Sequence, residues 1–283
     1  MELDQTPPFN RIGIVGLGLI GGSIALGARH KWPSSLVIGV DSNEVLERAH
    51  VARAIDVAGS DLDMLAEVDL VILAAPVLTN IEILTRLPEI VTGDAVVTDV
   101  GSTKAAIVQA AQALPERLAF VGGHPLAGAA RGGIGAARVD LFHQRPWVLT
   151  PDGASEAVIE RLERFARGFG AEPRRMAAAD HDRITGWVSH LPQLTASALM
   201  RVVGDAVGED GLELAGRGLR DTTRLADSPS TIWVDVCRTN RATIADALDH
   251  LVAELQRLRD GLDDAAAVES TFEAAVAWRK RME

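Results

Sequence analysis

The segment RIGIVGLGLIGGS, residues 11–23, joins a short apolar run to a cluster of glycines. The apolar part has the length of a buried strand, and Gly16, Gly18 and Gly21 follow it. In a strand-turn-helix unit, the first glycine allows a tight turn, the second lets a pyrophosphate approach the backbone, and the third brings the helix close to the strand. The pattern therefore predicts a dinucleotide-binding turn with phosphates at the helix N-terminus. We expect the binding backbone to be that of Gly16, Gly18, Leu19, Ile20 and Gly21.

A second apolar run, residues 36–40, ends at Asp41, twenty residues after Gly21. A carboxylate in this place accepts hydrogen bonds from the adenosine ribose of NAD. The alternative is a glycine turn before an ordinary core helix with Asp41 as a cap, and it explains the spacing poorly. No arginine directly follows Asp41 to bind a 2′-phosphate, and Glu44 would repel one. The sequence thus predicts NAD rather than NADP.

Composition excludes several classes of protein. The 283 residues carry a net charge of −11, which is contrary to nucleic-acid binding. The lone cysteine, Cys237, excludes a disulfide framework and indicates a reducing cytoplasm. Residues 12–28 are apolar but hold six glycines, so they fit strand, turn and helix rather than a signal peptide or membrane span. We expect residues 1–8 to form an unstructured leader.

Further apolar runs of strand length predict a parallel sheet. Helical patterns separate them, as a doubly wound sheet requires. The predicted strands are residues 70–75, 95–99, 120–122, 147–150 and 172–176, with helices near 81–87 and 156–169. We therefore expect an α/β fold whose first domain, residues 1–176, is a Rossmann-type doubly wound sheet that binds the dinucleotide.

Functional groups in such a sheet lie at the carboxyl ends of its strands. This rule selects three loops, residues 76–79, 100–104 and 122–128. We expect Ala75 and Pro76, at the first, to contact the cofactor. Ser102 is predicted to hydrogen-bond near the nicotinamide, and a helix N-cap is its alternative role. His124 is predicted to take the proton of a substrate hydroxyl while NAD accepts hydride.

The strand patterns stop after Ala177, so residues 177–283 are predicted to form an all-helical second domain. One helix carries apolar residues at alternating spacings of four and three, namely Ile244, Leu248, Leu251, Leu255, Leu258 and Leu262. This period favours a helix-helix seam. The seam fits either another helix of the same chain or a dimer contact.

Two histidines of this domain, His181 and His190, are nine residues apart. On a straight helix they lie on opposite faces, so they are not expected to serve one pocket. Pro192 deprives the Val188 carbonyl of its helical donor and predicts a kink there.

Several arginines cluster farther along, in residues 216–224. A dianionic substrate needs guanidinium groups of this kind. The alternative is that most of them are solvated or paired with Asp221 and Asp227. The arginines are Arg217, Arg220 and Arg224.

Five blocks of the chain, taken in order, carry a family resemblance. They resemble signature blocks of the prephenate and arogenate dehydrogenases of tyrosine biosynthesis, and the match spans nearly the whole chain. Dehydrogenases of 3-hydroxy acids and pyrroline-carboxylate reductases share the first block but not the later ones. The blocks are GLGLIGGS at 16–23, DVGSTK at 99–104, GHPLAG at 123–128, WVSHLP at 187–192, and LRDTTRLA at 219–226 with Trp233.

The resemblance implies oxidative decarboxylation of prephenate to 4-hydroxyphenylpyruvate with NAD, or alternatively of arogenate to tyrosine. His124 matches the catalytic histidine, which acts on the ring hydroxyl, and Ser102 would hydrogen-bond the same region. His190 matches a second active-site histidine, and Arg224 the arginine that grips a substrate carboxylate. Loss of carbon dioxide then aromatises the ring. We also expect a homodimer formed through the helical domain, a small-molecule substrate, and no nucleic-acid, membrane or metal partner.

One departure concerns the substrate's side chain. Some prephenate-using members carry Thr-Glu after the third block, where this chain has Ala129, Ala130 and Arg131. Arogenate-using relatives also lack that carboxylate. The charge of Arg131 favours prephenate, while the alanines resemble arogenate users. Because the chain ends soon after the predicted helical domain, we expect neither the regulatory ACT domain nor the fused chorismate mutase of some relatives.

Two other readings compete. A 3-hydroxy acid dehydrogenase typically places a catalytic lysine in its helical domain, and the sequence has no lysine between Lys104 and Lys280. A non-catalytic NAD-binding sensor would not need Ser102, His124, His190 and Arg224 together.

Overall fold

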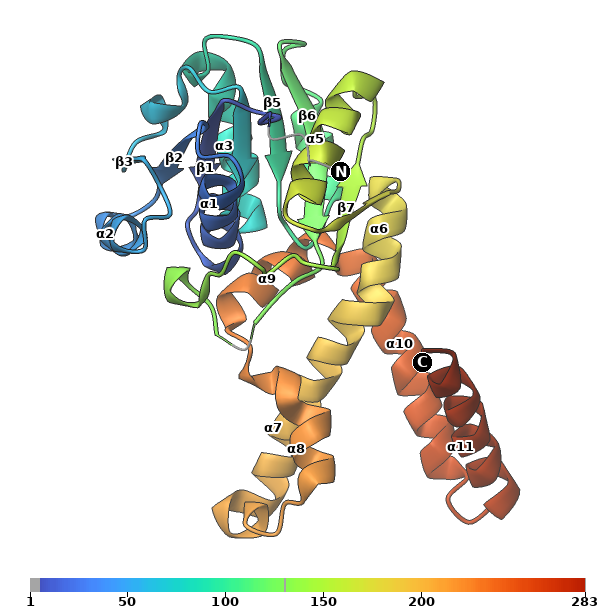
Figure 1. Ribbon diagram of the computed structural model, residues 1–283. Helices are drawn as coiled ribbons and strands as arrows, with labels where there is room; N and C mark the ends of the chain where they lie inside the picture. The colour runs from blue at the N-terminus through green and yellow to red at the C-terminus, as the bar shows by residue number, and fades with distance from the viewer. Residues whose placement is uncertain (1–5, 130, 283) are drawn as a thin grey trace. The chain divides into compact units, whose positions relative to one another are not determined.

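The computed structural model describes residues 6–129 and 131–282. The chain divides into two compact units (Figure 1). One runs to Thr185 and includes Asp227–Asn240, and the other holds Gly186–Ala226 and the chain from Arg241 onward.

Within the described residues, the strands of the first unit form one eight-stranded sheet in the order β3-β2-β1-β4-β5-β6-β7-β8 (Figure 1). The first six are parallel and follow the order 3-2-1-4-5-6 of dinucleotide-binding sheets. The predicted doubly wound sheet is therefore confirmed. The strands are β1 Arg11–Val15, β2 Leu36–Val40, β3 Val57–Gly59, β4 Leu70–Leu73, β5 Ala95–Asp99, β6 Leu118–Pro125, β7 Pro146–Thr150 and β8 Glu172–Arg175.

The end of the sheet differs from the expectation of parallel strands throughout. Strand β7 is antiparallel to β6, with Gly122 opposite Thr150, whereas β7 and β8 are parallel. Parallel neighbours need a crossover connection, which is usually a helix. In the described part of the link from β6 to β7 there is only a short 3-10 turn, Ile134–Ala136, so the chain turns back beside β6.

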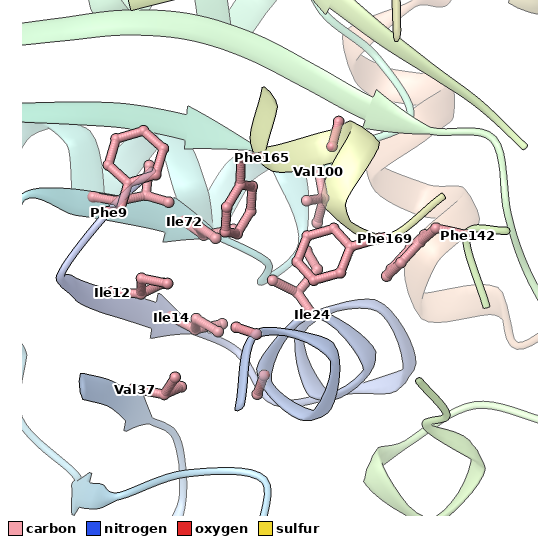
Figure 2. Close-up of a cluster of buried hydrophobic side chains, with 14 of the residues drawn as sticks. Phe9, Ile12, Ile14, Ile24, Val37, Ile72, Val100, Phe142, Phe165 and Phe169 are labelled. Carbon is pink, nitrogen blue, oxygen red and sulfur yellow. The ribbon is translucent and has the colours of Figure 1, made fainter. Parts of the chain in front are cut away.

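Successive residues of a strand point to opposite faces of the sheet, and both sets are apolar here, so helices cover both faces. Ile12 and Ile14 of β1 join one buried cluster with side chains of α1 and α5, which Figure 2 shows. Val15 faces the other cluster, with side chains of α3 and α4. The helices of this unit are α1 Leu19–Lys31, α2 Asn43–Val51, α3 Val77–Ile90, α4 Ala105–Ala111, α5 Glu156–Gly168, α6 Ala178–Thr185 and α9 Ser230–Thr239.

The prediction that residues 1–8 form an unstructured leader is wrong at Pro8, and residues 1–5 lie outside the described residues. Pro8 is buried, and its carbonyl accepts a hydrogen bond of 2.6 Å from Arg161 Nε. The guanidinium of Arg161 also lies 4.0 Å from the ring centroid of the fully buried Phe9. These contacts anchor the chain before β1, because burying the Phe9 ring favours order.

Within the described residues the chain after Ala177 is helical, as predicted, and the second unit holds the part of it outside α6 and α9. Its elements are the π-helical turn η3 Gly186–His190, the helices α7 Leu191–Leu212, α8 Arg217–Thr223, α10 Arg241–Asp260 and α11 Ala265–Arg279, and the short turn η5 Lys280–Met282. The short turn η4 Arg224–Asp227 runs across the boundary of the unit at Ala226. The regular α-helix is interrupted directly before Pro192, which lies in the first turn of α7. A π turn absorbs the donor that the proline lacks.

The apolar seam of α10 is buried at one end and exposed at the other. Ile244 is 5% exposed, whereas Leu255 is 54% exposed and Leu262, just past the helix, is 66% exposed. Within this unit, α10 packs against η3, α7 and α11. The start of the seam therefore packs within the chain, whereas Leu255 and Leu262 stay exposed.

Glu163 of α5 gives a stability prediction that depends on pH. Its carboxylate accepts hydrogen bonds from Arg175 Nε at 2.5 Å and Arg167 at 2.9 Å. The Arg175 hydrogen bond above all lowers the pKa of Glu163 below its ordinary value of 4.5, against the effect of burial. Because the folded-state pKa is the lower one, the carboxylate stabilises the fold above 4.5 and loses this effect as the pH falls through the folded-state pKa.

We expect Glu163→Gln to lower the free energy of unfolding by about 1.5 to 3 kcal/mol near neutral pH, since hydrogen bonds to a charged group are lost. The difference from wild type should shrink in acid. Urea denaturation over a pH series measures it, with Glu160→Gln, an exposed position of the same helix, as the control. A difference independent of pH would contradict the assignment.

Candidate active site

The glycine-rich turn after β1 has the geometry that two of its glycines require. Gly16 adopts φ +93°, and a Cβ there would lie 2.7 Å from backbone atoms of Ala74 and Ala75. A Cβ on Gly21 would lie 1.9 Å from the Gly16 carbonyl oxygen. At Gly18 no heavy atom lies within 4 Å of the Cβ position. Gly16 and Gly21 thus serve the fold, and Gly18 borders open space at the start of α1.

Asp41, at the end of β2, ties this turn to the next strand. Its carboxylate accepts hydrogen bonds from Leu17 N at 2.7 Å and Ser42 N at 2.6 Å. A carboxylate offers about four acceptor sites, so capacity remains for the two hydroxyls of a ribose. The nearby Arg48 of α2 is paired with Glu44 at 2.6 Å, an ion pair that the sequence analysis did not anticipate.

The loop that holds Ala75 and Pro76 is fixed by Asn80, a residue that the sequence analysis missed. Asn80 is fully buried, and its Nδ2 donates to the carbonyls of Leu73 at 3.1 Å and Ala75 at 2.9 Å. Its Oδ1 accepts from Ala75 N at 3.2 Å. Helix α3 then begins after Pro76, and Leu78 N donates to Asp235 of α9 at 3.1 Å.

Ser102 lies half-buried between β5 and α4. Its alternative role as the cap of α4 is not seen, because the helix begins at Ala105. The carboxylate of Asp182 instead accepts from Lys104 N at 2.7 Å and Ala105 N at 2.9 Å. A residue of α6 therefore binds the first amides of α4, and the sequence held no local sign of it.

Lys104 and Asp99 form an ion pair that is fully buried. Lys104 Nζ also donates to the Gly123 carbonyl at 2.8 Å, while Gly123 N donates to Asp99 at 3.1 Å. Burial lowers the pKa of Lys104, and the charges of Asp99 and Asp182 oppose that effect. The pair holds both backbone polar groups of the residue before His124. The DVGSTK block thus supplies Asp99 and Lys104 as well as Ser102, and the sequence predicts a role for Ser102 alone.

His124 lies at the carboxyl end of β6, beside the strand β5 that leads to Ser102. Its Nδ1 is 2.8 Å from His181 Nε2, and His181 Nδ1 is 2.8 Å from Asp182 Oδ1. His181 is 1% exposed and Asp182 is 4% exposed. Helix geometry predicts that His181 and His190 face apart, but it does not predict the contact of His181 with His124. The adjacent His181 and Asp182 were the feature of the sequence that could have indicated this contact.

His190 and Arg224 belong to the second unit. His190 is buried at the end of the π-helical turn, and Arg224 is exposed. Gln193, which is 4% exposed, donates from Nε2 to the Leu225 carbonyl at 2.7 Å and so ties α7 to the backbone beside Arg224. Sequence reasoning missed Gln193.

The three arginines of the 216–224 cluster are solvated. Within residues 6–129 and 131–282, none of them forms an ion pair with a carboxylate. Ala129 and Arg131 are exposed, and Ala130 lies outside the described residues. The described part of the chain holds no group of His, Cys, Asp and Glu residues placed to bind a metal, and no helix long and apolar enough to cross a membrane.

Comparisons with known proteins agree with this architecture. Residues 24–173 match the family description "Prephenate dehydrogenase, nucleotide-binding domain" and residues 177–273 match "Prephenate dehydrogenase, dimerization domain". The chain belongs to the prephenate dehydrogenase family.

Individual members of the family are similar over most of their length. The prephenate dehydrogenase of Lactococcus lactis is 34% identical over 97% of this chain and 78% of its own. The structure of the A. aeolicus enzyme in complex with hydroxyphenyl propionate and NAD+ has a TM-score of 0.88 at 28% identity, covering 100% of both chains. The Synechocystis arogenate dehydrogenase has a TM-score of 0.80 at 30% identity, covering 96% of this chain and 100% of its own.

The glycines of the nucleotide-binding turn give a matched pair of variants. Gly21→Ala forces a Cβ against the Gly16 carbonyl, so we expect a loss of about 1 to 3 kcal/mol in stability from overpacking. Gly18→Ala has space and should keep the melting temperature near wild type. It should still raise the Kd for NAD about tenfold, because the methyl group occupies the approach of the pyrophosphate. Thermal melts and calorimetry test both, and unchanged NAD affinity in Gly18→Ala would contradict the placement.

Proposed function

We propose that this member of the prephenate dehydrogenase family oxidatively decarboxylates prephenate to 4-hydroxyphenylpyruvate with NAD, using His124 as the base. The observation that carries the proposal is the position of His124. It stands at a strand's carboxyl end, next to a backbone held by a buried ion pair, and beside the strand that leads to Ser102. The A. aeolicus relative, whose structure contains NAD+, supports the cofactor.

The residues of the first unit fit NAD. The Cβ position of Gly18 faces open space, and α1 begins at Leu19 without a side-chain cap, so its first amides are available to phosphate oxygens. Asp41 retains acceptor capacity for the ribose. We propose that Ala75 and Pro76 contact the cofactor from the neighbouring strand end. When bound, NAD supplies the acceptor for the hydride that leaves the substrate.

The chain's own residues then act on the substrate. His124 takes the proton of the ring hydroxyl as the C–H hydride departs, so the C–O bond becomes a carbonyl. Ser102 hydrogen-bonds the same oxygen region and orients the ring. Decarboxylation then breaks the bond between the ring and its carboxylate, and the electron pair of that bond stays in the ring. The ring becomes aromatic, its carbonyl oxygen takes up a proton to become the phenol hydroxyl, and the reaction is effectively irreversible. We assign His190 and Arg224 to the substrate, with Arg224 gripping a carboxylate.

We further propose two functional regions. Residues 1–176 bind the dinucleotide, and residues 177–283 bind substrate and form a homodimer, in keeping with the dimerization-domain description of residues 177–273. A set of exposed apolar side chains on the second unit supports the dimer, because such surface is normally covered. It comprises Leu255, Leu262, Phe272, Val276 and Trp278. We place the enzyme in the cytoplasm.

The role of His124 is tested by His124→Asn. Asparagine places its amide near the position of Nδ1, so it can keep the hydrogen bond to His181 while removing the base at Nε2. We expect kcat with prephenate to fall by about 10² to 10⁴ and NAD affinity to change little. Stopped-flow turnover and NAD titration measure both. His30→Asn, an exposed position at the end of α1, is the control, and a near-normal kcat in His124→Asn would refute the role.

The choice of substrate is the last point of the proposal. Prephenate ends its side chain in a keto acid, whereas arogenate carries an ammonium group. The exposed Arg131 repels an ammonium, which favours prephenate, although the Synechocystis relative is an arogenate dehydrogenase.

Both substrates share the ring carboxylate, so Arg224→Ala should impair both. We expect a loss of about 1.5 to 3 kcal/mol of binding, or roughly ten- to a hundredfold or more. Values of kcat/KM for both substrates test this, with the exposed Arg201→Ala as the control. A wild type that prefers arogenate, or an Arg224→Ala variant that loses one substrate alone, would contradict the proposal.

A further inference from the structure

A buried line of hydrogen-bonding groups lies behind His124. It runs from His124 Nδ1 to His181 Nε2 and from His181 Nδ1 to Asp182 Oδ1, with 2.8 Å at each step. His181 and Asp182 are buried, whereas His124 is half-buried. All three lie in the first unit, so the line is internal to it.

The polarity of this line follows from its buried end. Asp182 accepts hydrogen bonds from two backbone amides, those of Lys104 and Ala105, as an ionised carboxylate does. It therefore accepts from His181 Nδ1 as well. Neutral His181 then offers a lone pair on Nε2, and His124 must donate to it from Nδ1. The neutral His124 is left with its own lone pair on Nε2.

From this geometry we propose that His181, oriented by Asp182, is a positioning residue that fixes His124 in the tautomer whose Nε2 accepts the substrate proton. The inference rests on the proposed function, in which His124 is the base. A histidine free to exchange tautomers would present a protonated Nε2 part of the time, and that form cannot take a proton.

The surroundings hold His181 and Asp182 in place. Thr185 Oγ1 donates to the His181 carbonyl at 2.9 Å, and Asn240 Nδ2 donates to the Asp182 carbonyl at 2.7 Å. Two charged groups of β5 and the start of α4 lie near the line: Asp99 and Lys104 pair with each other, and the charge of Asp182 also acts on Lys104. The carboxylate of Asp182 is thus the anion in contact with His181.

The line also stabilises His124 after it has taken the proton. The imidazolium keeps donating from Nδ1 to His181, and Asp182 lies behind with a negative charge. Removal of His181 should therefore lower kcat and leave the KM for NAD unchanged. It should also move the acid limb of the pH profile of kcat/KM to lower pH, because the imidazolium loses an acceptor and releases its proton more readily.

Two substitutions separate this role from a packing role. His181→Leu fills space without an acceptor, and we expect kcat with prephenate to fall about 100-fold. His181→Gln places Oε1 near the position of Nε2, so it can accept from His124, and it should recover most of the lost kcat. Steady-state kinetics over a pH series, on protein checked for a wild-type melting temperature, gives both readouts. An unchanged kcat and pH profile in His181→Leu, or a glutamine variant no better than leucine, overturns the proposal.

A measurement on the wild type covers the case in which the variants do not fold. Nitrogen chemical shifts of the His124 ring should show a protonated Nδ1 and an unprotonated Nε2, and the reverse overturns the proposal. Wild-type turnover of prephenate is measured first. Its absence contradicts the proposed function, whereas wild-type activity with unaffected His181 variants contradicts the positioning role alone.

Discussion

The loops of the candidate active site depend on the buried ion pair between Lys104 and Asp99. Burying two charges carries a desolvation cost that their attraction does not reliably offset, so such a pair is weak evidence for stability, while removal of one partner typically costs about 3 to 5 kcal/mol. Here the charges also bind the amide and the carbonyl of Gly123. A Cβ on Gly123 would lie 2.5 Å from the Asp99 carbonyl oxygen, so the close approach requires glycine. The pair locates the backbone that carries His124.

Distant carboxylates and amides fix the other loops in the same manner. Asp182 binds the first amides of α4, and Asp41 binds the amide of Leu17 in the glycine-rich turn. Asn80 closes the turn before α3. Because buried backbone groups need partners, each of these side chains satisfies the backbone and immobilises a loop at the same time. The loops at the carboxyl edge of the sheet are thus held by side chains of the first unit itself.

Sequence reasoning succeeded where the determining contacts are local. The run of glycines specifies the β1–α1 turn within a few residues, and the apolar runs at 36–40 and 95–99 coincide with β2 and β5. It failed for contacts between distant segments. His124 and His181 are 57 residues apart, and helical periodicity tells which face a residue occupies but not what covers that face. The direction of β7 likewise follows from the link before it, whose described residues form no helical crossover, and apolar patterning does not reveal this.

In the first unit, the residues that we propose to act on the substrate are more exposed than the residues that hold them in place. His124 and Ser102 are half-buried, as contact with a substrate requires, whereas their supporting residues Lys104, His181 and Asp182 are almost fully buried. A polar residue at the end of a strand can be recognised in a sequence, because it interrupts an apolar run at a predictable place. A buried polar residue is tolerated only when it is hydrogen-bonded, so its presence implies a partner that the sequence does not name. Buried polar side chains near a strand's carboxyl end are therefore the positions at which a structure adds most to a sequence.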